Sequence, residues 1–225
     1  MIPPAALMLA DGRLPWGGHA HSGGVEAAVA RGWVHDLGSL AAFARGRLAT
    51  AGLTEAALVA ATVLRSSDSV SWEELDAEAS ARIASPALRL VSRKLGGQLL
   101  RVARTTWPDR RLDGLAAASP PPGPHRAVAL GATAAGAGLS PSEAAACAAY
   151  DAVAGPCAAA VRLLGLDPFA VTRLVAEMGD QVAAVSGEAA QAAAGPLGDL
   201  PAPAATLVEV AAEDHARWEV RLFAS

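Results

Sequence analysis

Near the start of the chain, the side chains best suited to metal binding or catalysis are two histidines and a glutamate: His19, His21 and Glu26. Imidazole and carboxylate groups are ligands of transition metals, so the trio suggests a small metal-dependent enzyme. The signal is weak, because no His-x-x-x-His or HExxH pair supports it and the other histidines are distant in sequence. We keep the metal enzyme as an alternative and expect no dedicated metal site.

Other patterns argue against further kinds of catalytic site. The glycine-rich stretch around the histidines lacks the Lys-Ser/Thr of a P-loop, and Ser22 is not in a Gly-x-Ser-x-Gly elbow. Cys147 and Cys157 have no neighbouring histidine and are ten residues apart, too far for a disulfide within one helix. We expect buried reduced thiols and no cofactor. Asp76 and Glu78 are expected on a solvated helix face.

A shaped loop must position the residues of the trio. Glycines allow backbone angles that are closed to other residues, and Pro15 fixes its own φ. We therefore predict a structural loop motif within residues 1–26, with Ser22 as the N-cap of the helix that follows. The residues expected to shape this motif are Asp11, Pro15, Gly17, Gly18 and Gly24.

Composition favours an all-α fold. Of the 225 residues, 52% are hydrophobic but only 4% are aromatic, so alanine and leucine must supply the core. Alanine is the best helix former, and β-branched residues are sparse. The net charge of -4 gives no basic footprint for nucleic acid. The N-terminus has no basic signal region, and the apolar stretch 127–139 is too short for a bilayer, so we expect a cytoplasmic protein with a buried helix there.

Capping signals predict a single-domain compact bundle of about eight to ten helices. A linker at 195–203 precedes a C-terminal tail, residues 204–225. Residues 110–124 form a proline- and glycine-bearing connection, and one apolar stripe extends from Val171 to Val185. The expected helix starts are Asp36, Thr54, Ser71 with Glu74, Ser85-Pro86, Ser140-Pro141-Ser142-Glu143 and Asp167-Pro168.

The N-terminal loop also resembles the signature of the urease accessory protein UreF family, an Asp-x-x-Leu-Pro-x-Gly-Gly followed by an aromatic and a Ser-x-Gly-Leu-Glu run. His19 stands where the family usually has Phe or Tyr, and Val25 replaces its Leu. The residues that match are Asp11, Leu14, Pro15, Gly17, Gly18, Ser22, Gly24 and Glu26.

Further segments resemble the same family in order along the chain. In the C-terminal ending, Ala216 replaces a Glu and Ala224 replaces an Arg. The similar segments are Trp72, Leu75, Asp76 and Arg82; Ser92-Arg93-x-x-Gly96; Pro124-His125-x-x-Val128-Ala129-x-Gly131; Ala152-Val153 through Arg162-Leu163; and His215 with Arg221-Leu222-Phe223-x-Ser225.

The resemblance implies a non-enzymatic, all-α homodimer that bridges UreD and the GTPase UreG, delivers nickel to apo-urease and modulates GTP hydrolysis by UreG. It assigns a UreG-facing set, Glu26, Arg162 and Ser22. It also assigns a UreD or dimer set, His215, Arg221, Leu222 and Phe223.

The helix within 127–138 and the stripe 171–185 are the expected dimer surfaces. A generic helical oligomerisation module is the third alternative, beside the scaffold and the metal enzyme.

Overall fold

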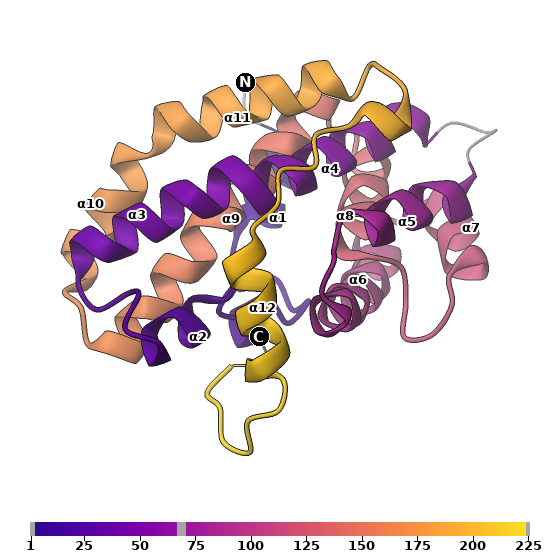
Figure 1. Cartoon of the computed structure of the whole chain (residues 1–225). Coiled ribbons are helices and arrows are strands. Elements are labelled where there is room, and N and C mark those ends of the chain that lie inside the picture. Colours follow the sequence, from indigo (N-terminus) through magenta and orange to yellow (C-terminus); the bar gives the residue numbers. More distant parts are fainter. Residues whose placement is uncertain (1–2, 67–70, 224–225) are drawn as a thin grey trace.

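The computed structural model describes residues 3–66 and 71–223, and every regular element in these ranges is helical (Figure 1). The all-α prediction is therefore confirmed. The α-helices are α1 (Pro4–Ala10), α2 (Val25–Ala30), α3 (Leu37–Arg47), α4 (Leu53–Arg65), α5 (Trp72–Ala81), α6 (Pro86–Thr106), α7 (Arg110–Ala118), α8 (Arg126–Gly136), α9 (Pro141–Leu164), α10 (Pro168–Glu177), α11 (Gly179–Ala192) and α12 (Thr206–His215). Shorter turns are η1 (Gly18–Ala20), the π-helical η2 (Leu48–Gly52) and η3 (Leu197–Asp199).

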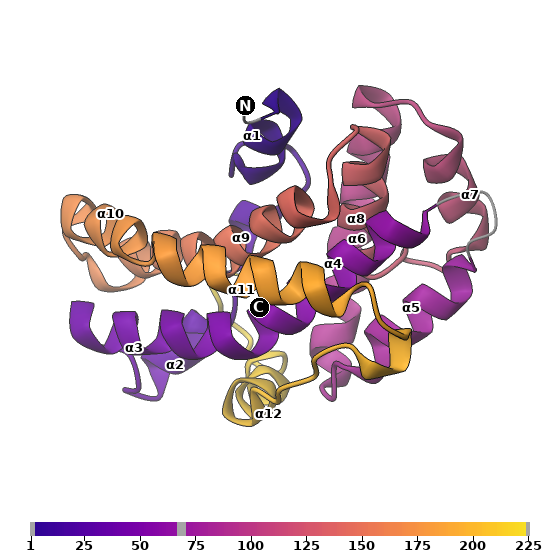
Figure 2. The same ribbon diagram turned by 90° about the horizontal axis from the view of Figure 1, so that it is seen from above.

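Helix α9 is the centre of the arrangement. It contacts α1, α2, α3, α4, α8, α10 and α11. Seen from above, α11 lies across α4 and α9 (Figure 2). At the other end α6 packs on α8, and α12 contacts both α2 and α6. The C-terminal tail thus lies against the helix that follows the N-terminal loop.

Small residues permit the close packing of α8 in this core. A Cβ added to Gly131 would lie 2.5 Å from Thr62 Cβ and 2.7 Å from the Val59 carbonyl oxygen of α4. Residues 126–135 are all buried within the chain, so the buried helix predicted there is confirmed. The same burial corrects its assignment as a dimer surface, since its apolar side chains are already covered by the chain's own helices.

Most predicted helix starts are correct. The Asp36 side chain accepts from the Ser39 N–H, and Ser71, Ser85 and Asp167 cap their helices in the same way. Ser140 and Glu143 form a full capping box, and Gly165 ends α9 in the left-handed conformation.

The start predicted at Thr54 is wrong, because α3, η2 and α4 form one helical run over residues 37–65. Backbone angles stay helical through Leu48 and Leu53, so the N–H groups of the expected first turn already have partners.

Two other predicted segments divide differently. Asp109 accepts from the Arg111 N–H and starts α7 inside the expected connection, where Leu112 and Leu115 are fully buried. The expected stripe 171–185 breaks at Met178, where α10 ends and α11 begins. Val171, Leu174 and Met178 face the chain's own core, so only part of this stripe remains for another molecule.

Two helical stretches, residues 37–65 and 141–164, are long and apolar enough to cross a membrane by length and composition alone. In each, 61% of the most apolar window is buried inside the fold. Such burial is typical of core helices in soluble proteins.

Candidate functional site

Three glycines give the N-terminal loop its shape. Gly17, Gly23 and Gly24 have φ angles of 87°, 61° and 90°, in the left-handed region that side chains disfavour. Gly18 is required for another reason, because a Cβ there would lie 2.5 Å from the ring of Trp16. Trp16 itself is buried, and its ring lies 5.3 Å from the guanidinium carbon of Arg126.

Ser22 is fully buried but is not the formal N-cap of α2. Gly24 occupies that position without a side-chain hydrogen bond. The Ser22 hydroxyl still accepts from the Glu26 N–H at 3.3 Å, so it satisfies one donor of the first turn. Gly23 and Gly24 place the N-cap of α2 two residues after Ser22. Ser22 therefore bonds to the first turn from outside the formal cap position.

The Glu26 carboxylate joins the N-terminal loop to the C-terminal tail. The residue is 7% exposed. Its Oε2 accepts from His215 Nε2 at 2.8 Å and from the Phe223 N–H at 3.1 Å, while Oε1 accepts from the Leu222 N–H at 2.8 Å. One buried carboxylate thus fixes both α12 and the chain that follows it.

Aromatic rings complete this junction. The His215 ring contacts Trp218 with centroids 4.6 Å apart, and the exposed Arg162 guanidinium carbon lies 5.0 Å from the Phe223 ring. His215 and Phe223 are buried, whereas Arg221 and Leu222 face solvent. The structure therefore brings members of the two predicted partner-binding sets into contact around the buried Glu26, with Arg162 against Phe223. Ser225, the last residue of the predicted ending, lies outside the described residues.

The proposed metal trio is not assembled. Glu26 is engaged by the tail, while His19 and His21 line a different hollow beside Tyr150 and Arg162. In residues 3–66 and 71–223 no three His, Cys, Asp or Glu side chains gather in a group that could hold a metal ion. Burial, with the nearby charge of Arg126, lowers the pKa of His21 to about 4.

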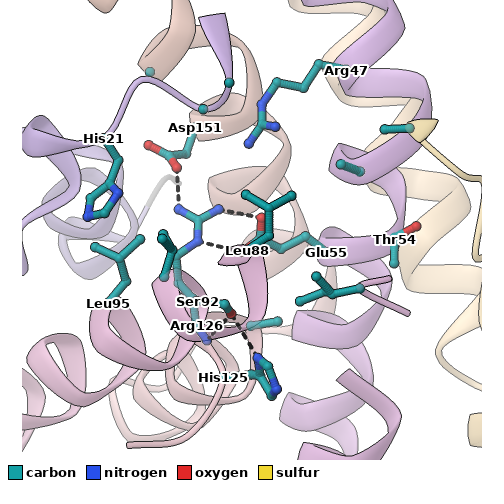
Figure 3. Close-up of a pocket in the computed structure, with 18 of the residues that line it drawn as sticks. His21, Arg47, Thr54, Glu55, Leu88, Ser92, Leu95, His125, Arg126 and Asp151 are labelled. Atoms are coloured by element: carbon teal, nitrogen blue, oxygen red, sulfur yellow. Dashed lines mark hydrogen bonds and ion pairs between the residues drawn. The ribbon is translucent and has the colours of Figure 1, made fainter. Parts of the chain in front are cut away.

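A second polar cluster lies beside the loop and lines a cavity of about 190 Å³ (Figure 3). Arg126 Nε donates to Glu55 Oε1 at 2.6 Å, Nη2 donates to Glu55 Oε2, and Nη1 bonds Asp151 Oδ2. These groups come from α8, α4 and α9, and Arg47 approaches them from the end of α3 (Figure 3). Burial opposes the charge of Arg126, but the two carboxylates raise its pKa above the ordinary value.

The burial of Asp76 contradicts the prediction that this residue lies on a solvated helix face. Asp76 is 9% exposed, its Oδ1 accepts from the His125 N–H at 2.8 Å, and its Oδ2 accepts from Arg93 at 2.6 Å. His125 lies between the hydroxyls of Ser80 and Ser92, at 2.7 and 3.0 Å. Burial, with the Arg93 charge, lowers the pKa of His125 to about 4. This network is a buried structural connection between α5, α6 and α8.

The cysteine prediction is confirmed, because Cys147 and Cys157 are free and buried. Burial raises the pKa of each thiol to about 11, so neither is a reactive thiolate at neutral pH.

Sequence reasoning missed the roles of Arg47, Glu55, Arg126 and Asp151. They are isolated charges in alanine-rich helices and only the fold gathers them. The available signal was the placement of four charges on otherwise apolar helix faces.

Comparison with known proteins identifies a family. The family model described as UreF matches residues 34–179. A protein named urease accessory protein UreF from Mycolicibacterium vanbaalenii is 42% identical over 219 residues, 97% of each chain. Proteins of the same name from Mycobacterium marinum and Mycobacterium tuberculosis H37Rv are 42% and 39% identical, again over 97% of each chain. The likeness thus extends over nearly the whole chain.

Proposed function

The chain belongs to the UreF family of urease accessory proteins, and from that premise we propose that it is a non-catalytic scaffold that bridges UreD and the GTPase UreG while nickel is delivered to apo-urease. The observation that carries the proposal is the junction at Glu26. There the N-terminal motif and the C-terminal ending, two segments that resemble the family's signature and ending, meet through three hydrogen bonds. Such an arrangement provides shape and polar anchors rather than a reaction centre.

The tail supports the assignment of the UreD side. Val220 and Leu222 are 88% and 67% exposed, and Leu207 and Val210 on α12 are 68% and 61% exposed. Fully burying such side chains is worth roughly 1.5–3 kcal/mol each. A partner that covers α12 and the tail would gain this energy while leaving the Glu26 anchors in place.

Removal of residues 221–225 tests the UreD side. Pull-downs with UreD should lose binding, while circular dichroism stays nearly unchanged because no helix extends beyond His215 in the described chain. Arg221→Ala should weaken binding, and Arg45→Ala, at an exposed arginine of α3 outside the tail, is the matched control. A truncated chain that binds UreD like the wild type would show that the tail serves only intramolecular packing.

Arg162 supports the assignment of the UreG side, since its exposed guanidinium lies beside the Glu26 junction. Arg162→Ala should weaken UreG recruitment by a few kcal/mol if the charge becomes desolvated, and less at a rim. UreD binding by the same variant checks that the tail is intact, and the exposed Arg173→Ala is the matched control. Normal UreG recruitment and urease activation by Arg162→Ala would refute this assignment.

We further propose a cytoplasmic homodimer with no resident cofactor. Free buried thiols fit a reducing compartment. Since α8 is covered within the chain, the dimer contact must use other apolar groups, and Phe169 at the start of α10 is 85% exposed. Light scattering gives the mass of the chain alone and with UreD. A monomer under both conditions would contradict the dimer, and a dimer that binds neither partner would favour the generic oligomerisation module.

A further inference from the structure

We propose that the cavity beside Arg126 binds a small organic carboxylate, with the carboxylate on Arg47 and the hydrocarbon part against the leucine and valine side chains of α6. The volume of about 190 Å³ far exceeds the roughly 10–15 Å³ that one water needs. Leu88, Val91 and Leu95 form part of the wall. A mostly apolar cavity with a few directed polar groups is the usual form of a small-molecule site.

Unpartnered donors single out this cavity. Within residues 3–66 and 71–223, three buried side-chain nitrogen or oxygen atoms have no hydrogen-bond partner: Arg47 Nε, Thr54 Oγ1 and Arg82 Nε. All three residues line the cavity. Each atom can donate a hydrogen bond, and leaving a buried donor unpaired is energetically unfavourable. The wall therefore favours a molecule that accepts hydrogen bonds.

Arg47 is the strongest of these donors. Of the arginines in the described part of the chain that are at least partly buried, it alone has neither a hydrogen bond nor an ion pair. Its guanidinium points toward Asp151 and Arg126 in Figure 3. Gly23 makes room for it, since a Cβ there would lie 3.2 Å from Arg47 Nε. The absence of a side chain at Gly23 thus leaves space for the guanidinium at the cavity wall.

Arg126, Arg82 and Glu209, the other charged side chains considered on the cavity wall, each have at least one partner. Arg126 is paired with Glu55 and Asp151, and Arg82 is bonded to Glu78 and to backbone carbonyls near η3. Glu209 accepts from the Ser85 N–H at 2.9 Å. Arg47 is the remaining cation, and the planar fork of a guanidinium matches a carboxylate with two parallel hydrogen bonds.

Calorimetric titration of the full chain with butyrate tests the proposal, with butyramide as the uncharged ligand of similar shape. Butyrate should bind at least tenfold more tightly than butyramide. Arg47→Gln should weaken butyrate binding at least tenfold. The matched control Arg45→Gln removes the same charge from an exposed arginine on the same helix and should leave the affinity within twofold. These titrations contain neither UreD nor UreG, so their failure would leave the scaffold proposal untouched.

A second measurement avoids dependence on the folding of a variant. In nitrogen-15 spectra of the wild-type chain, butyrate should shift the Nε–H signal of one solvent-protected arginine, and butyramide should not. Absence of butyrate binding, equal affinity for butyramide, or binding without a shift of that signal would each overturn the proposal. Butyrate binding that persists in Arg47→Gln would place the anion elsewhere and overturn it as well.

Discussion

Removing the Glu26 carboxylate should release the C-terminal tail while the helical core stays folded. In Glu26→Ala, His215 Nε2 and the N–H groups of Leu222 and Phe223 all lose their acceptor. Phe223 and His215 are 4% and 2% exposed, so these donors would be left unpaired in a buried place. Phe223 keeps its apolar burial and its contact with the Arg162 guanidinium, so the variant removes only the polar anchor of the tail.

The size of the effect follows from the three hydrogen bonds. A hydrogen bond to a charged group contributes about 1.5–3 kcal/mol. The three share one carboxylate and are not additive, so their joint loss should cost less than the sum of the three, about 3–5 kcal/mol. Because 1.4 kcal/mol corresponds to a factor of ten, the docked tail should be disfavoured by roughly 100-fold to 3,000-fold.

Amide hydrogen exchange measures this change directly, since it reports local opening residue by residue. The Leu222 and Phe223 amides of Glu26→Ala should lose about 100-fold or more of their protection, whereas amides in the middle of α9 should keep theirs. Glu219→Ala removes the same charge from an exposed residue of the tail and should change neither. Protection of Leu222 and Phe223 in Glu26→Ala equal to that of the wild type would refute the reasoning.

Three further predictions concern the core. Gly18→Ala should lower the free energy of unfolding by about 1–3 kcal/mol, because the added methyl group clashes with Trp16. Thermal unfolding measures this change. The control Gly12→Ala has nothing within 4 Å of its added Cβ and should have little effect. Arg126→Met leaves Glu55 and Asp151 without their cation and should cost about 3–5 kcal/mol in urea unfolding, whereas Arg104→Met breaks an exposed pair with Asp113 and should cost about 1 kcal/mol or less. Folding lowers the pKa of His125 from 6.5 to about 4. Between pH 6.5 and pH 4 the unfolded chain therefore binds a proton at His125 that the folded chain does not bind. The free energy of unfolding should therefore decrease as the pH is lowered from 6.5 to 4, and a constant value across that window in urea titrations would contradict this origin of the shift.

Local signals predicted much of the fold because they act within a few residues. Asp36, Ser85 and Ser140 each satisfy first-turn N–H groups next to them in sequence, so a capping pattern was sufficient. The helix start predicted at Thr54 was wrong, because no residue just before it interrupts the helix, so its capping side chain is not needed there. The cap at Asp109 was hidden by Pro108 before it and by the proline cluster at 120–124 after α7.

The candidate site was less predictable because its contacts join distant segments. Glu26 and Phe223 are almost the whole chain apart, and no periodicity indicates that one accepts a hydrogen bond from the other. Asp76 illustrates the same limit: its helix carries many charges, yet the Arg93 side chain and the His125 backbone reach it only after α5, α6 and α8 have packed. Family resemblance supplied the proposed partner-binding residues, and the structure showed that Glu26, His215, Leu222 and Phe223 are in contact.

The central claim, that this chain bridges UreD and UreG, is tested most directly by immobilising UreD and measuring how much UreG is retained with and without the chain. We expect UreG to be retained only when the wild-type chain is present. The chain lacking residues 221–225 should not be retained by UreD and should retain no UreG. Equal retention of UreG in the absence of this chain, or no retention in its presence, would contradict the claim.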